Sequence, residues 1–180
     1  MTASPQWFGP QDRPLFGWLH APPDGRARAG VVLCPSFARE DHKGHNAFQV
    51  LAERLVSQGL AVLRFDYDGM GDSAGSNHDP GRVDAWLRST ADAIALVRRF
   101  GVPRVSLVGM RIGATIAAHA ASDDGDIDQL VLWDACLSGR AFLREQQLLS
   151  VLKLAAPRRG GTVKWDTGHC HRCRPELYPH

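Results

Sequence analysis

Short apolar runs separated by helical segments are the feature of this sequence that most constrains its fold. The runs end at proline, glycine or aspartate, as strands buried on both faces of a sheet do, and they lie at 31–34, 61–65, 105–108 and 130–133, with a further strand predicted at 15–20. Apolar stripes with helical spacing predict helices at about 48–58, 80–100, 112–121 and 142–154. Right-handed crossovers join such strands, so the order predicts an α/β fold whose mostly parallel sheet has helices on both faces.

Composition and charge exclude several classes of protein. The chain has 180 residues, of which 44% are hydrophobic and 22% charged, which is ordinary for one globular domain and excludes a disordered chain. The net charge is only +2, which argues against nucleic acid or an anionic membrane as a partner. No apolar window approaches the roughly 18–20 residues of a membrane span, and residues 1–6 do not resemble a secretory signal. These features predict a cytoplasmic location.

The composition changes near residue 155. Residues 151–180 contain six Lys or Arg against two Asp or Glu, and they hold two of the four cysteines and three of the eight histidines. We therefore expect a core at 1–155 and a basic, Cys- and His-containing tail, or the start of a lid, at 156–180. The segment 169–173, with two histidines and two cysteines, contains zinc-ligand residue types, but a structural site needs a second ligand pair at a distance. The sequence thus predicts no metal and no cofactor.

One strand end has the pattern of a catalytic turn. Active sites of open parallel sheets lie beyond the carboxyl ends of the strands. At 109–113 the chain reads Gly-Met-Arg-Ile-Gly, directly after the strand at 105–108 and before a helix. This is the frame of the nucleophile elbow, G-x-S-x-G, in which Gly109 and Gly113 permit a tight turn that lifts the middle side chain toward a substrate.

The strands, their order and this elbow resemble the alpha/beta-hydrolase superfamily, in its serine aminopeptidase or lysophospholipase-like branch. The resemblance covers about residues 5–155. Within it, residues 109–114, Trp133 and 137–140 are similar to the exosortase-associated hydrolases. The resemblance implies a hydrolase of ester or amide bonds. It also implies that the last strands of the family's sheet are missing from these 180 residues, which would leave an open apolar sheet edge and favour self-association.

The middle position of the elbow departs from the family. Arg111 stands where the nucleophilic serine belongs. A guanidinium stays protonated at any working pH and has no lone pair with which to attack a carbonyl. The resemblance therefore implies a hydrolase fold without the family's nucleophile, and whether the chain is an enzyme is left open.

Other parts of the family's machinery have candidates in the sequence. Asp134, after the strand at 130–133, is a candidate for the acid, and His169 or His171 could supply the base. The backbone N–H groups of Ile112 and of Phe37, or of Ser36 beside it, would form an oxyanion hole. His42 and His45 precede the first long amphipathic stripe and could line a pocket.

Two functions follow from these residues. The first is an alpha/beta-hydrolase family protein that is truncated or catalytically impaired, with a small-molecule acyl ligand. The alternative is a non-catalytic module that holds an anionic small molecule with Arg111 and the oxyanion-hole amides, since a helix N-terminus and a cation both favour an anion. An esterase assay would distinguish them.

Overall fold

The computed structural model describes residues 2–36 and 41–155. Its centre is a sheet of six strands in the order β1-β2-β4-β3-β5-β6. Strands β4, β3, β5 and β6 are parallel, while β2 pairs antiparallel with both β1 and β4. The strands are β1 Thr2–Phe8, β2 Leu15–Ala21, β3 Ala29–Cys34, β4 Leu60–Phe65, β5 Val105–Met110 and β6 Leu130–Trp133.

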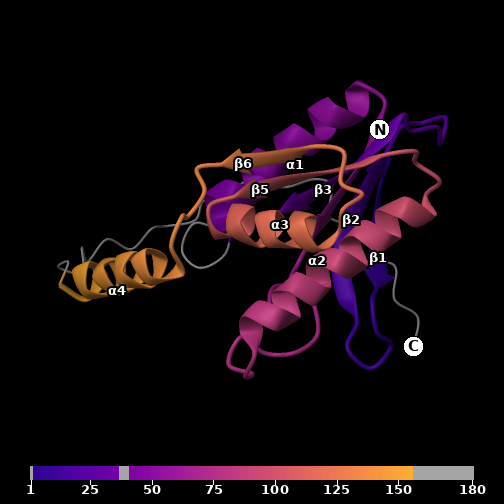
Figure 1. The fold of residues 1–180 in the computed structure, drawn as a ribbon. Helices are drawn as coiled ribbons and strands as arrows, with labels where there is room; N and C mark the ends of the chain where they lie inside the picture. Colours follow the sequence, from indigo (N-terminus) through magenta and orange to yellow (C-terminus); the bar gives the residue numbers. More distant parts are fainter. Residues whose placement is uncertain (1, 37–40, 156–180) are drawn as a thin grey trace, which may run out of the picture.

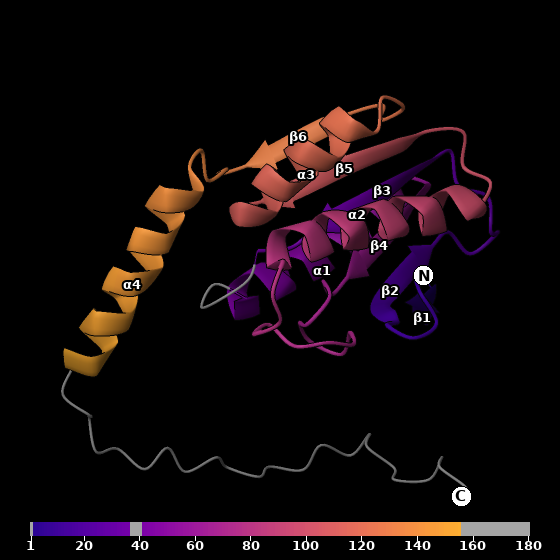
Figure 2. The same ribbon diagram turned by 60° about the horizontal axis from the view of Figure 1, so that its bottom comes forward.

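Helices cover both faces of this sheet, as the alternation of runs predicted. Helices α2 (Arg82–Arg99) and α3 (Ile112–Asp123) lie on one face and α1 (Asp41–Ser57) on the other (Figure 1). Buried apolar side chains form a core on each side, and the α1 core joins Phe48 and Ala52 to Val31 and Val62. Helix α4 (Gly139–Ala155) stands out from the body (Figure 2). The predicted alpha/beta-hydrolase fold is confirmed.

Several details differ from the sequence prediction. Helix α1 begins at Asp41 rather than near 48, and α4 begins at Gly139 rather than near 142. Strand β1, which contains Pro5, was not predicted; it lies at the edge of the sheet, where a residue without an N–H is tolerated. Helix α2 begins at Arg82 rather than at Pro80, because Gly81 adopts a left-handed conformation with φ 68° and ends the preceding turn. Asp79 directly precedes the helix start expected at 80, where an Asp can cap a helix, but its carboxylate instead accepts the Ser76 N–H at 3.0 Å.

Partly buried ion pairs fix the loop after β4. Arg13, from the β1–β2 turn, bonds Asp68 through two nitrogens, one of them 2.9 Å from Oδ1, and Arg82 donates to the same oxygen at 2.6 Å. The Asp68 side chain is 8% exposed, and its pKa is held below the usual value chiefly by the hydrogen bond from Arg13. In the same loop, Ser73 Oγ accepts the Phe16 N–H at 2.9 Å and donates to the Asp66 carbonyl at 2.7 Å. Ser73 therefore braces a turn.

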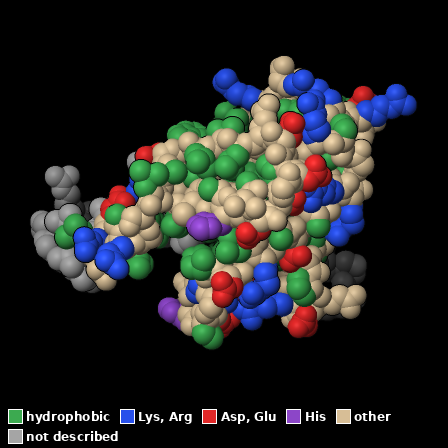
Figure 3. Space-filling model, in the orientation of Figure 1, with side chains coloured by type: hydrophobic (Ala, Val, Ile, Leu, Met, Phe, Trp, Pro, Cys, Tyr) green, Lys and Arg blue, Asp and Glu red, His purple; other side chains and the backbone are tan. Residues whose placement is uncertain are grey.

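Strand β6 is paired on one side only within the described residues. It bonds β5, and its four side chains, all apolar, are 38–48% exposed. Figure 3 shows hydrophobic side chains gathered on the face over which β6 runs. Among residues 2–36 and 41–155, no strand pairs with the outer edge of β6, and its side chains form an apolar surface, the combination that favours pairing with another chain.

We expect the protein to self-associate through β6, because edge pairing would satisfy these backbone groups and cover the apolar side chains. Val131→Lys should weaken the association, since a charge on an edge strand opposes pairing. Light scattering after size-exclusion at several concentrations measures the effect. Val83→Lys on α2, where Val83 is 59% exposed, is the matched control and should leave the association unchanged. A monomer at every concentration contradicts the prediction.

Candidate functional site

A tight turn joins β5 to α3 at Arg111. This residue has φ 56° and ψ −122°, a positive φ that a side-chain-bearing residue adopts only when its surroundings impose it. Its N–H donates to the Trp133 carbonyl at 2.9 Å, and its carbonyl accepts the N–H groups of Ala114 at 3.1 Å and Cys136 at 3.3 Å. Bonds from the end of β6 and the first turn of α3 thus hold the strained backbone in place.

The two glycines of the elbow allow backbone segments to approach each other closely. A Cβ on Gly109 would lie 2.4 Å from the Cα of Ala114. A Cβ on Gly113 would lie 2.3 Å from the carbonyl oxygen of Pro35 and 2.4 Å from that of Cys34. All three distances are far below a van der Waals contact, so α3 starts directly against the chain that leaves β3. The elbow and the end of β3 therefore meet at the carboxyl edge of the sheet.

The guanidinium of Arg111 is paired with two carboxylates of the same chain. Nη1 lies 3.1 Å from Oδ2 of Asp134, and Nη2 lies 2.8 Å from each carboxylate oxygen of Glu145. The Arg111 side chain is only 20% exposed, while those of Asp134 and Glu145 are 69% and 46% exposed. Arg111 is the cation of this group, and both of its printed partners are carboxylates.

Asp134 and Glu145 come from different elements. Asp134 directly follows β6 and has a φ of 49°, which turns the chain away from the sheet. Glu145 lies in the second turn of α4. The structure brings Asp134, the candidate acid, to the elbow, but its partner there is Arg111. Glu145 was missed because no sequence motif marks it. The available signal is its spacing from Phe142, which is buried in the core. Residues three apart lie on the same face of a helix, so Glu145 shares the inward face of Phe142.

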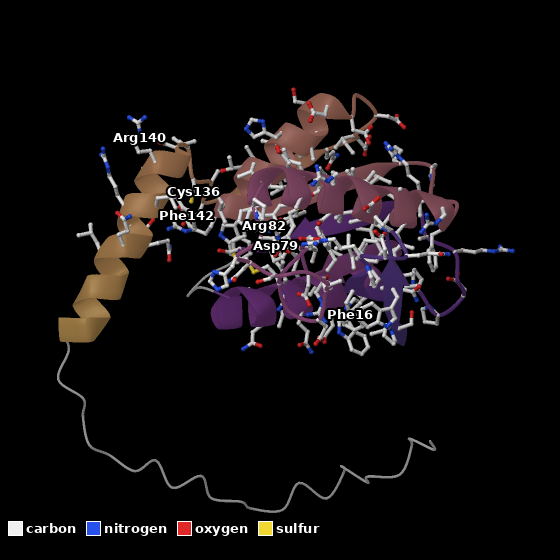
Figure 4. The ribbon with its side chains drawn as sticks, turned by 90° about the horizontal axis from the view of Figure 1, so that it is seen from below. Phe16, Asp79, Arg82, Cys136, Arg140 and Phe142 are labelled. Carbon is white, nitrogen blue, oxygen red and sulfur yellow. The ribbon has the colours of Figure 1, made fainter. Side chains whose placement is uncertain are left out.

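The first turns of α4 attach it to the body. Phe142 is 8% exposed and belongs to the core that α2 and α3 share. The loop before α4 is held by Thr115, whose hydroxyl donates to the Cys136 carbonyl at 2.6 Å. Cys136 and Phe142 lie where the chain passes from the body into α4, and Arg140 points away from the body (Figure 4).

A buried thiol lies at the end of β3. Cys34 is wholly buried, and burial raises its pKa to about 12. Tyr67 is also fully buried, and burial raises the pKa of its phenol well above the usual value. Both groups stay protonated at neutral pH, and the nucleophilic form of a cysteine is the thiolate. Cys34 therefore does not replace the missing serine.

The remaining candidates fall in different places. Ile112 is the first residue of α3, where the N–H groups of a helix have no intrahelical acceptor, and Ser36 is buried at the end of β3. Phe37 lies outside the described residues, as do the side chains of His42 and His45 and the whole segment 169–173. Over the described part of the chain, no three Cys, His, Asp or Glu residues are grouped to hold a metal, and no helix is long and apolar enough to cross a membrane.

One cavity of the described structure is separate from the elbow. It has a volume of about 400 Å³ and lies beside the ion pairs of Arg13, Asp68 and Arg82, between the β1–β2 turn and α2. Asp79 and Arg82 lie close together there (Figure 4). Arg111 does not line this cavity.

Comparison with known proteins gives a family and a fold. Residues 25–176 match the model of a hydrolase family described as serine aminopeptidase, S33. No curated protein matches the chain.

Solved structures share the fold at low sequence identity. DcsB in complex with its substrate analogue is 24% identical with a TM-score of 0.65, over 84% of this chain and 52% of that one. A serine hydrolase without a lid from Xanthomonas campestris is 21% identical with a TM-score of 0.59, over 70% and 58% of the two chains. The alpha/beta hydrolase GrgF from a Penicillium species is 18% identical with a TM-score of 0.63, over 86% and 53%. The chain therefore spans little more than half the length of these structures.

Gly113→Ala should destabilise the protein by about 1–3 kcal/mol, because the added methyl group meets two backbone carbonyls that cannot move independently of β3. Gly125→Ala is the matched control, since nothing lies within 4 Å of a Cβ built there. Urea unfolding followed by circular dichroism measures both free energies of unfolding. Equal stability of the two variants would show that the elbow does not pack against the chain after β3.

Proposed function

This chain belongs to the serine aminopeptidase S33 family of alpha/beta-hydrolases, and we propose on that premise that its elbow no longer carries out serine-type hydrolysis. The pairing of the Arg111 guanidinium with Asp134 and Glu145 is the observation that carries the proposal. It supports the view that the side chain at the tip of the elbow, Arg111, is a cation held in place by two carboxylates. Such a cation can neither attack a carbonyl nor be made nucleophilic by a neighbouring base.

The surroundings of Arg111 support the same proposal. In the family's reaction, an acid orients a histidine, and the histidine takes the proton from the serine. Here Asp134 bonds Arg111, and the second group on the guanidinium is another carboxylate, Glu145. Acids placed in this way neutralise a cation and do not form a proton relay. The backbone of the turn nevertheless keeps the shape that presents residue 111 beyond the strand end.

One observation favours a second function, the binding of an anionic small molecule. The Arg111 fork already holds a carboxylate with two bonds of equal length, 2.8 Å, to the oxygens of Glu145. Guanidinium groups bind carboxylates in this way in many recognition sites. The N-terminus of α3 begins at the next residue, Ile112, and adds a favourable field for negative charge. We propose that Arg111 and the Ile112 amide form an anion site.

A fluorophosphonate probe should leave the purified chain unmodified, because the elbow offers no serine hydroxyl. Intact-mass spectrometry detects the adduct, and an active serine hydrolase treated in parallel shows that the reagent is intact. If an adduct forms, the proposal is wrong about the chain's reactivity. Ser36→Ala and Ser73→Ala would then show which hydroxyl reacted.

Arg111→Ser alone should not produce esterase turnover, because the groups that face the elbow from β6 and α4 are Asp134 and Glu145 rather than an imidazole. A serine without a base is a weak nucleophile at neutral pH. Arg111→Gln, which offers no hydroxyl, is the control in a p-nitrophenyl acetate assay. Turnover of Arg111→Ser well above that of Arg111→Gln would reveal a base that reaches the elbow.

A further inference from the structure

Helix α4 carries a single acidic residue, and that residue is placed on Arg111. Glu145 is the only Asp or Glu in Gly139–Ala155, a segment that also contains Arg140, Arg144 and Lys153. The helix stands out from the body in two views (Figures 1 and 2). Its polar link to the elbow is the pair of 2.8 Å bonds between Glu145 and Nη2 of Arg111.

We infer that Glu145 is the resident occupant of a carboxylate site on Arg111, and that a small-molecule monocarboxylate binds there by exchange with Glu145. This inference rests on the anion site proposed above and adds its ligand class and its control. The carboxylate of Glu145 matches a ligand carboxylate in charge and shape. The helix therefore competes with the ligand for the same donors.

The exposure of the Arg111 and Glu145 side chains permits such an exchange. Arg111 is 20% exposed, so its guanidinium is held in one orientation, while Glu145 is 46% exposed and in contact with water. Ion pairs with an exposed partner are weakly held, because water and salt compete for both charges. Glu145 belongs to the same chain as Arg111. Its effective concentration near the guanidinium is therefore on the order of millimolar, as it is for groups joined by a short linker.

Asp134 determines which anions can replace Glu145. It lies 3.1 Å from Nη1 of Arg111 and follows β6 directly, so it stays in place when α4 moves. An entering monocarboxylate leaves the net charge of the group unchanged, whereas a dianion adds a negative charge beside Asp134. Like charges that share one guanidinium repel each other. The site therefore prefers a monocarboxylate to a phosphate dianion.

Exchange at Arg111 also changes the attachment of α4. When a ligand takes the place of Glu145, Phe142 remains buried in the core, but the next turn loses its link to the elbow. The amide protons of α4 beyond Phe142 should then exchange faster with solvent, because fewer contacts hold this part of the helix against the body. Binding of a carboxylate at Arg111 is thereby coupled to loosening of α4.

The test is a titration of the full chain with sodium acetate at constant ionic strength, followed by NMR chemical shifts. Glu145→Gln removes the internal competitor, so the Kd for acetate should fall by about 5-fold. Glu53→Gln on α1 makes the same change of charge away from the elbow and should leave the Kd unchanged. Arg111→Gln should not bind. Phosphate at pH 8 should bind the Glu145→Gln variant more weakly than acetate.

Hydrogen exchange of Gly139–Ala155 provides the second measurement. Acetate should accelerate it in the unaltered chain, whereas in Glu145→Gln it should be fast without acetate and insensitive to it. If the unaltered chain and Glu145→Gln bind acetate equally, the anion site stands and the internal competition is wrong. If neither protein binds acetate more tightly than Arg111→Gln does, the proposed anion site itself is wrong. If phosphate binds the Glu145→Gln variant more tightly than acetate does, the inference that the ligand is a monocarboxylate is wrong.

Discussion

The close approach of the β5–α3 turn to the chain leaving β3 is the constraint on which the rest of the structure depends. Without a Cβ on Gly113, the carbonyls of Cys34 and Pro35 can lie against the first turn of α3. This contact sets the direction of α3, which in turn covers β5 and β6. Arg111 lies between the close contacts at Gly109 and Gly113, and in this tight turn it adopts a positive φ. The strain is tolerated because hydrogen bonds from β6 and α3 hold both backbone groups of that residue.

The geometry of the elbow is thus independent of the side chain at its tip. The bonds that hold the turn involve only the backbone N–H and carbonyl of Arg111. A substitution at this position changes the chemistry of the site and leaves its shape intact. An elbow of this shape would present a serine nucleophile to a substrate, but here it presents the Arg111 cation. The arginine side chain is longer than that of serine and reaches Asp134 and Glu145. The turn therefore keeps its shape with a cation in the place of a nucleophile, and this is the basis of the proposal that it does not carry out serine-type hydrolysis.

The ion-pair groups of Asp68 and of Arg111 differ in burial, and this difference separates their roles. Asp68 is 8% exposed and is held by Arg13 and Arg82, so breaking this pair would leave a charge in a poorly solvated position. The carboxylates on Arg111 are largely exposed, and water can replace either of them at small cost. The first group fixes the loop after β4 to α2 and the β1–β2 turn. The second is suited to exchange.

The sequence by itself determined the order of strands and helices, because buried strands and amphipathic helices require different spacings of apolar residues. It also located the elbow, since Gly109 and Gly113 frame a turn that few other residues allow, and the chemistry of Arg111 follows from the residue type alone. The start of α2 was wrong by two residues, because the left-handed conformation of Gly81 outweighed the capping potential of Asp79. Strand β1 was missed because it is stabilised by pairing with β2, and the residue types of Thr2–Phe8 alone do not indicate a strand.

Only the tertiary structure decided what surrounds Arg111. Asp134 is near in space because β6 is parallel to β5 and ends at the same edge of the sheet, a placement the order of strands made foreseeable. Glu145 is 34 residues from Arg111 along the chain, and its contact depends on how α4 is oriented once Phe142 enters the core. A helix pattern specifies which residues share a face but not what that face meets. The partner of the elbow residue is therefore a property of packing, and no local spacing encodes it.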